Sequence, residues 1–244
     1  PYASSDDPET ELADAVETEL RPAYRRHRAV LADELGPHAR SDDRAGLCWL
    51  DEGAELYQAL IGLHTGLDLS PQELHDIGQR QATVELPEEF RAVGSAAFGT
   101  SDLAEIFDRL LHDTSLRYSN AEEILAHAQR CLDEAATALD GWFDLVPEAP
   151  CELTPVPDFL AADAPAAYYT PPAPDGGRPG EYHVNLHDPT ARSRAETASI
   201  AFHEAIPGHH LQLAIASERS ELPAFRRLSW GHTAFVEGWA LYTE

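Results

Sequence analysis

The chain has 244 residues, 43% of them hydrophobic, which is enough for one large domain or two small ones around a hydrophobic core. Its formal charge is −26 and all 17 basic residues are arginine, which argues against a nucleic-acid-binding or anionic-membrane surface, because such surfaces need clustered positive charge. No run approaches the roughly 18 apolar residues of a membrane-spanning helix, and no signal peptide is visible, which slightly favours the cytoplasm.

Helical patterns fill residues 1–146, and we expect this stretch to be a helical N-terminal part. Ser70 begins a capping box that has Glu73 at its third helical position and Pro71 at its first. Asn120 is a second N-cap, again followed by Glu three residues later. The predicted helices cover about 9–35, 47–63, 71–90, 102–116 and 120–139.

Residues 147–180 differ in character, since they hold 9 of the 18 prolines and several glycines. Such a composition predicts irregular, extended chain. One interpretation is a linker between independent domains. We prefer a long loop packed over a cleft, because the segment also contains Phe159, Tyr168 and Tyr169.

Residues 181–186 alternate in character and predict a short strand. A helical pattern then resumes near Thr190 and continues, with one break, to Glu244. We expect residues 147–244 to form the loop, strand and metal-binding helices of one catalytic domain. The chain begins at Pro1, contains no Met and ends inside a helical pattern, so we expect a truncated or processed product, for which an exported form stays open. The sequence does not indicate an oligomeric state.

The chemistry is concentrated in the segment AFHEAIPGHHLQ, residues 201–212. In HExxH enzymes, two histidines one helical turn apart hold zinc and the glutamate acts on the water that zinc activates. Here Pro207 occupies the position four after His203, so the strict pattern fails. On an unbroken helix, neither His209 nor His210 could share one ion with His203.

Pro207 and Gly208 mark the place where the helix can deform. Pro207 lacks an N–H and its ring would clash with the carbonyl of His203, whereas glycine accepts unusual backbone angles. A bulge at this point would absorb the two extra residues and bring His209 back beside His203. His209 is therefore favoured as the second ligand, with His210 as the alternative.

A third ligand is needed, and the segment FVEGWALYTE, residues 235–244, offers Glu237. The 28 residues after His209 leave room for a helix, a turn and a second antiparallel helix. Glu244 lies two turns after Glu237, on the same helical face, and could orient a histidine ligand.

These residues predict a mainly α-helical, zinc-metallopeptidase-like fold with a short edge strand or small sheet beside the metal helix. Zn²⁺ on His203, His209 and Glu237 would activate water, and Glu204 would be the general base that cleaves a peptide or small amide substrate. One alternative is a non-catalytic protein with a structural metal site, in which His209 and His210 would both bind and close the site. Another is a metal-dependent amidase that acts on a non-peptide C–N bond.

The strand before the metal helix is the predicted substrate-binding element. Peptides commonly bind by adding a strand to an exposed sheet edge. We expect residues 182–186 to be such an edge beside the metal, with Tyr182, His183, Val184 and Asn185 contacting substrate.

The chain resembles the bacterial "domain of unknown function 885" family. The resemblance is carried most specifically by AFHEAIPGHHLQ and FVEGWALYTE, and it extends to Ala167–Pro172, Asp175–Asn185 and Leu69–His75. Members are mostly helical and are regarded as zinc peptidases akin to thimet oligopeptidase and Taq-type carboxypeptidase. The resemblance implies His203, His209 and Glu237 as ligands and Glu204 as the base. Members continue beyond the point that matches Glu244, which implies that further substrate-binding groups lie there, and substrates in the family are poorly defined.

Overall fold

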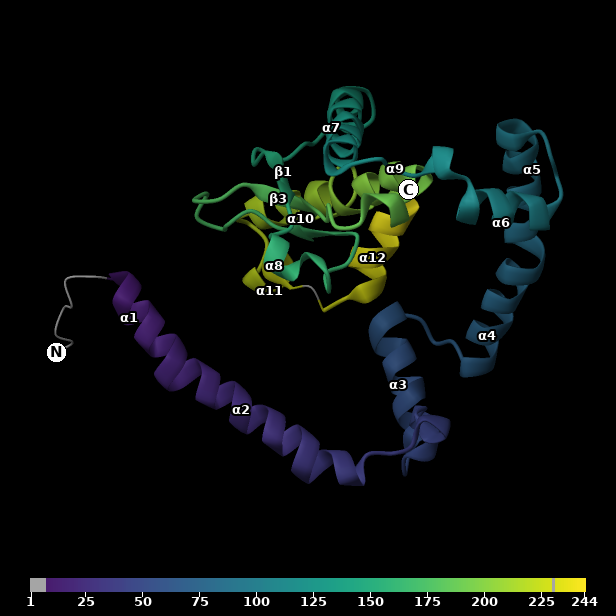
Figure 1. Ribbon diagram of the computed structural model, residues 1–244. Helices are drawn as coiled ribbons and strands as arrows, with labels where there is room; N and C mark the ends of the chain where they lie inside the picture. Colours follow the sequence, from purple (N-terminus) through teal and green to yellow (C-terminus); the bar gives the residue numbers. More distant parts are fainter. Residues whose placement is uncertain (1–7, 230) are drawn as a thin grey trace. The chain divides into compact units, whose positions relative to one another are not determined.

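The computed structural model describes residues 8–229 and 231–244, and the chain divides into two compact units, Pro1–Tyr57 and Gln58–Glu244. The protein is mainly helical with one small sheet, as the sequence predicts (Figure 1). In the first unit, helical turns run without a break from Pro8 to Leu35. They comprise α1 (Pro8–Ala15), the π-helical turn η1 (Val16–Leu20), α2 (Arg21–Ala29) and the π-helical turn η2 (Val30–Leu35).

The second unit contains most of the helices. The helix α3 (Gly53–Thr65) begins in the first unit and continues into the second. The others are α4 (Pro71–Arg80), α5 (Leu86–Phe98), α6 (Leu103–His112), α7 (Ala121–Ala138), α8 (Asp158–Ala161), α9 (Arg194–Glu204), α10 (His209–Glu218), α11 (Ala224–Leu228) and α12 (Thr233–Tyr242). The turn η6 (Gln81–Glu85) joins α4 to α5, so this helical segment extends beyond the predicted end near residue 90.

Both predicted N-caps are present, and each is a local interaction. The Ser70 hydroxyl accepts from the Glu73 N–H at 3.2 Å, and the Glu73 carboxylate accepts from the Ser70 N–H at 2.9 Å. The Asn120 side chain accepts from the Glu123 N–H at 2.9 Å and starts α7. These bonds satisfy main-chain donors that the first helical turn leaves unpaired.

The sheet has three strands in the order β1-β3-β2, where β1 is Cys151–Pro155, β2 is Ala167–Thr170 and β3 is Gly180–Val184. The strand β3 pairs parallel to β1, with Leu153 opposite Tyr182, and antiparallel to β2, with Tyr169 opposite Tyr182. The prediction of an edge strand at residues 182–186 is therefore wrong, since β3 is central. Alternation in a strand shows that one face of the sheet is buried. Central and edge strands both have this pattern, so it does not tell them apart. The proline-rich segment, expected to be irregular, supplies both neighbouring strands.

Contacts between distant segments fix the start of α9. The Arg194 guanidinium forms an ion pair with Glu123 of α7, lies 4.4 Å from the Tyr118 ring centroid and donates to the Arg117 carbonyl at 2.7 Å. The Tyr118 hydroxyl, in turn, hydrogen-bonds Thr197 at 2.5 Å. These contacts hold α9 against α7, and the hydrophobic core lies between α7, α9, α10 and β3.

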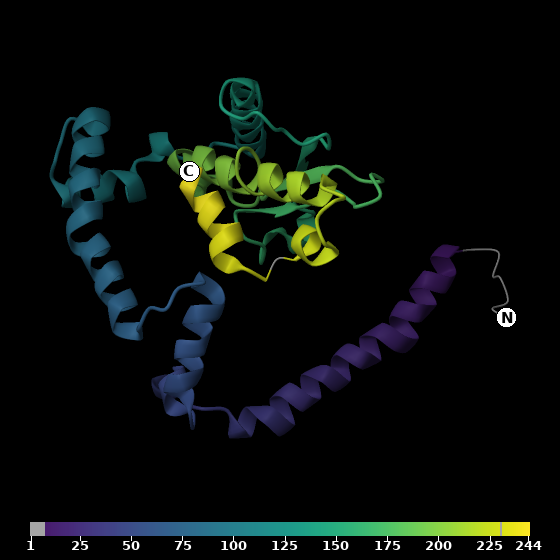
Figure 2. The same cartoon turned by 180° about the vertical axis from the view of Figure 1, so that it is seen from behind.

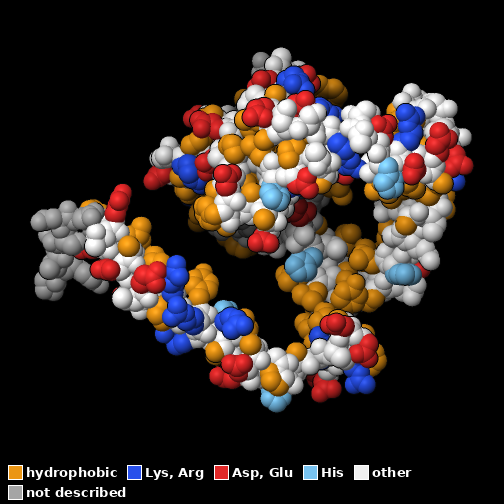
Figure 3. All heavy atoms as spheres, in the orientation of Figure 1, with side chains coloured by type: hydrophobic (Ala, Val, Ile, Leu, Met, Phe, Trp, Pro, Cys, Tyr) orange, Lys and Arg blue, Asp and Glu red, His pale blue; other side chains and the backbone are white. Residues whose placement is uncertain are grey.

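The end of α9, the start of α10 and α12 meet beside the sheet. The view from behind shows α9 and α10 in succession across the sheet, with α12 at a steep angle to them (Figure 2). The helix α9 contacts β2, and α12 contacts both α9 and α10. Acidic side chains are spread over the face seen in Figure 3, and basic ones gather over α2, which carries four arginines. Within the described ranges, no helix combines the length and the apolar character that crossing a bilayer requires.

Candidate metal centre

The helix α9 ends at Glu204 because of Pro207. A proline ring at this position would clash with the carbonyl four residues earlier, that of His203, if the helix continued. The chain instead makes a short non-helical passage over residues 205–208, and α10 begins at His209. His203 and Glu204 therefore occupy the C-terminal end of one helix, and His209 the N-terminal end of the next.

Main-chain hydrogen bonds show how the two extra residues are accommodated. The Gly208 N–H donates to the Phe202 carbonyl at 2.8 Å and the His210 N–H to the Ala205 carbonyl at 3.0 Å, so the bonds span six and five residues where a helix spans four. A Cβ atom on Gly208 would lie 2.0 Å from the carbonyl oxygen of His203, so only glycine fits. The result places the rings of His203 and His209 4.8 Å apart.

Glu237 of α12 approaches both histidines. Its Oε2 lies 3.4 Å from Nε2 of His203 and 3.7 Å from Nε2 of His209. One ligand atom from each of these three residues lies within 4.8 Å of the others. The His209 side chain is 7% exposed and that of Glu237 is 54% exposed, so the group is closed on the protein side and open towards solvent.

Glu244 orients the first histidine. Its Oε1 lies 2.8 Å from Nδ1 of His203. A carboxylate only accepts, so Nδ1 of His203 donates in this contact, and Nε2 is the ring nitrogen that faces Glu237. This is the position that the sequence assigned to Glu244.

Two other residues near the end of α12 hold the passage between α9 and α10. The indole N–H of Trp239 donates to the Pro207 carbonyl at 2.9 Å, and the Thr243 hydroxyl donates to the Phe202 carbonyl at 3.3 Å. Sequence analysis missed both. The only available signal was an indole N–H in an apolar helical stretch, since a buried Trp usually finds an acceptor.

Replacing Trp239 with Phe should loosen the candidate metal site of His203, His209 and Glu237 without unfolding the protein. The substitution keeps most of the ring packing and removes the donor to Pro207. A hydrogen bond of this kind contributes about 0.5–1.5 kcal/mol, so we expect up to about tenfold weaker metal binding. Titration with a competing chelator measures this, and Phe143→Leu, which alters the ring that Trp239 packs against, is the packing control. Equal weakening in both variants would assign the effect to packing.

Glu204 is half-buried beside this group. Burial raises the pKa of its carboxyl, the adjacent His203 opposes the rise, and Glu237 adds to it. The main-chain amide of Tyr169 interacts with the carboxylate and favours its charged form. A carboxylate with a raised pKa in a partly desolvated position has the properties of a general base.

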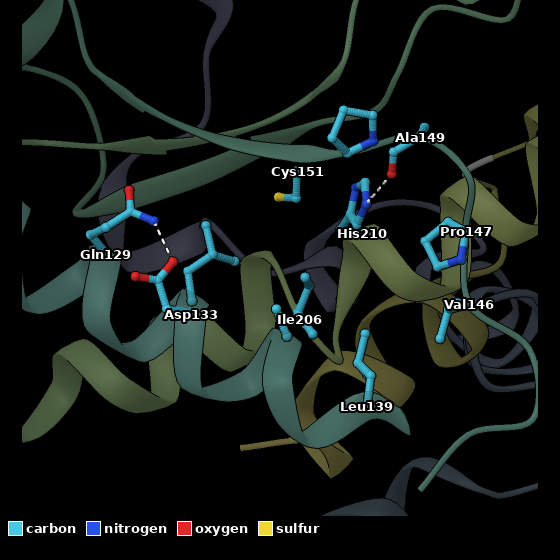
Figure 4. Close-up of a pocket in the computed structure, with 12 residues that line it drawn as sticks. Gln129, Asp133, Leu139, Val146, Pro147, Ala149, Cys151, Ile206 and His210 are labelled. Carbon is cyan, nitrogen blue, oxygen red and sulfur yellow. Dashed lines mark hydrogen bonds between the residues drawn. The ribbon is translucent and has the colours of Figure 1, made fainter. Parts of the chain in front are cut away.

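His210 lies away from this group, with both ring nitrogens engaged elsewhere. Nδ1 is 2.9 Å from the Tyr169 hydroxyl and Nε2 is 3.0 Å from the Ala149 carbonyl oxygen. The residue is 1% exposed and lines a cavity of about 330 Å³ between α7 and the loop before β1 (Figure 4). Of the two adjacent histidines, the structure therefore brings His209 to His203 and Glu237.

The four residues predicted to bind substrate occupy β3 and its end. Tyr182, Val184 and Asn185 are buried, with 1%, 4% and 1% of their surface exposed. The Asn185 amide donates to three carbonyls before β2, among them that of Ala161 at 2.8 Å. His183 is half-buried, and its ring is stacked on Tyr168 at 4.4 Å.

Comparisons with known proteins place the chain in a family. It is similar to the protein of "The crystal structure of the putative lipoprotein from Colwellia psychrerythraea", with 29% identity and a TM-score of 0.84 over 96% of this chain and 40% of that one. The chain thus spans less than half the length of that protein. No curated protein sequence matches it. The sequence profile of the family described as "Bacterial protein of unknown function (DUF885)" matches residues 2–244, and the chain belongs to this family.

Proposed function

We propose that the protein is a zinc-dependent hydrolase that cleaves peptide or related amide bonds. The observation that carries the proposal is the convergence of His203, His209 and Glu237 from three helices, with donor atoms within 4.8 Å of one another. Glu204 lies next to His203 in the chain, partly buried beside the same group. Two imidazoles and one carboxylate are a usual donor set for catalytic zinc.

The donor distances suit a single ion. Two donors bound at about 2.0–2.1 Å to a tetrahedral zinc ion lie about 3.4 Å apart. The separations from Glu237 to His203 and to His209 are 3.4 and 3.7 Å. All three ligand atoms lie within 4.8 Å of one another, so binding one ion would draw the donors closer together, and the contact of Glu244 with Nδ1 would leave Nε2 of His203 available to the ion.

The alternative of a structural metal site is less well supported. Structural zinc sites are closed by four protein ligands, whereas catalytic sites keep one position open. His210 was the candidate for a fourth ligand, and its ring nitrogens are engaged by Tyr169 and Ala149. The group of described residues that could hold a metal has three members, and its carboxylate is half exposed.

The proposed mechanism divides the chemistry between the ion and the chain. Bound zinc would supply Lewis acidity, which polarises a carbonyl and makes water acidic enough to be a nucleophile near neutral pH. Glu204 would accept the proton of the attacking water and pass it to the leaving amine. Burial raises the pKa of Glu204 above the usual carboxyl value, which favours a group that must both accept a proton and return it.

The sheet supports an extended peptide as substrate. The strand β2 has one strand neighbour in the sheet order, β3, and it contacts α9, the helix that carries His203 and Glu204. An extended chain could pair with the other edge of β2. β2 thus takes the role that the sequence assigned to β3. A metal-dependent amidase acting on a non-peptide C–N bond would use the same centre without this edge.

Metal analysis of matched variants tests the proposal. We expect the wild-type protein to bind about one zinc per chain. The variant Glu237→Ala should lose most of this zinc. The control Glu134→Ala, which changes an exposed glutamate of α7, should retain it. Added zinc should no longer raise the unfolding temperature of Glu237→Ala, because a metal stabilises the folded protein only by binding to it. A peptide mixture analysed by mass spectrometry then reports hydrolysis. If Glu237→Ala retained zinc, the proposed metal site would be wrong. If zinc-loaded protein left peptides and simple amides intact, the proposed hydrolase activity would be wrong.

A further inference from the structure

Tyr169 of β2 and His210 of α10 form a buried hydrogen-bonded pair. They are 8% and 1% exposed, and the Tyr169 hydroxyl lies 2.9 Å from Nδ1 of His210. The other ring nitrogen, Nε2, lies 3.0 Å from the Ala149 carbonyl oxygen (Figure 4). A carbonyl only accepts, so Nε2 carries the proton and Nδ1 accepts from Tyr169. The direction of both hydrogen bonds is thereby fixed.

The neighbouring strand leaves room for this pair at one position. A Cβ atom on Gly180 of β3 would lie 2.5 Å from Nδ1 of His210 and 2.8 Å from the Tyr169 hydroxyl oxygen. Such distances are well below van der Waals contact, so any side chain there would push the two groups apart. Three separate elements, β2, β3 and α10, therefore meet at this hydrogen bond.

The same tyrosine reaches the metal group from its other side. Its main-chain amide interacts with the carboxylate of Glu204. Its ring centroid lies 6.4 Å from that of His209. The position of Tyr169 on β2 therefore affects where Glu204, the proposed base, and His209, a proposed ligand, are held. Its side chain itself is not part of the proposed chemistry.

We propose that Tyr169 is a positioning residue: its hydrogen bond to His210 sets β2 against α9 so that its amide holds Glu204 in place. The inference rests on the proposed function, because Glu204 is the proposed base. Misplacing a catalytic group by about 1 Å can cost about a hundredfold in rate. The hydrogen bond of the Tyr169 hydroxyl therefore matters for turnover more than for folding. The neighbouring Tyr168, whose ring stacks on His183, has no such role.

Amide hydrogen exchange in the metal-free protein tests the anchor without relying on activity. Tyr169→Phe keeps the ring and removes the hydroxyl, and we expect the amide at position 169 to exchange about tenfold faster. Glu204→Ala should have the same effect on that amide, because it removes the group that the amide holds. Tyr168→Phe is the matched control and should leave the exchange unchanged. Unchanged exchange in both Tyr169→Phe and Glu204→Ala would overturn the proposal.

Kinetics of the zinc-loaded protein provide the second measurement. We expect Tyr169→Phe to retain zinc and KM and to lose roughly ten- to a hundredfold in kcat. Gly180→Ala should displace His210 from the hydroxyl and give a similar loss, and the double variant should lose little more than either single one. Additive losses, or a loss explained by zinc release, would overturn the positioning role. Wild-type protein that cleaves nothing would overturn the proposed function, while the exchange result would still decide the anchor.

Discussion

Replacing Glu204 with glutamine is expected to lower peptide hydrolysis by about 10²–10⁴-fold while zinc stays bound. Glutamine has nearly the same size and can keep the interaction with the Tyr169 amide, but it cannot accept a proton. The glutamate is half-buried and its pKa is raised by that burial, so removing its charge should cost the fold little. The rate would fall because glutamine cannot take over the proton transfer assigned to Glu204.

The comparison with Glu237→Ala makes this result diagnostic. Both glutamates lie beside one centre, and their proposed roles predict opposite patterns. Glu237→Ala should lose zinc, and activity should return in part at high zinc concentration, since the chemical groups remain. Glu204→Gln should hold zinc with wild-type affinity and gain nothing from excess metal. Full hydrolysis by Glu204→Gln would leave the proposed mechanism without its base, and zinc loss by this variant would exchange the two roles.

Replacing Gly208 with alanine is expected to abolish the metal centre and to destabilise the protein by at least about 1–3 kcal/mol. The new methyl group would lie 2.0 Å from the carbonyl oxygen of His203 and 2.3 Å from that of Phe202. Both are main-chain atoms, so no side-chain rotation relieves the overlap. The passage between α9 and α10 would have to open, which would move His209 away from His203.

A second glycine provides the control for this substitution. Gly238 follows Glu237 in α12, and a Cβ atom there would meet nothing within 4 Å. Gly238→Ala should keep zinc and gain about 0.5–1 kcal/mol, because alanine favours the helix. Thermal unfolding with and without zinc measures both variants. If Gly208→Ala bound zinc like the wild type, the close approach at Gly208 would not be what brings the two histidines together.

Local interactions account for what the sequence determined by itself. The N-caps at Ser70 and Asn120 join residues three apart, so their pattern is visible in the chain. The break after His203 follows equally from Pro207, whose ring excludes a continuous helix. The candidate group of His203, His209 and Glu237 could be named from residue type and spacing, since helical geometry limits which side chains can meet.

The tertiary structure alone decided the sheet order and the choice between the two histidines. The strand β3 is central because β1 and β2 pair with its two sides. These strands start 29 and 13 residues before β3. The alternation within β3 carries no information about either partner. His209 and His210 are adjacent, so spacing from His203 leaves both open. The choice depends on Tyr169 and Ala149, which bind the ring of His210 from positions 41 and 61 residues away. Such long-range pairing is set by the packing of the whole unit, which no local pattern contains.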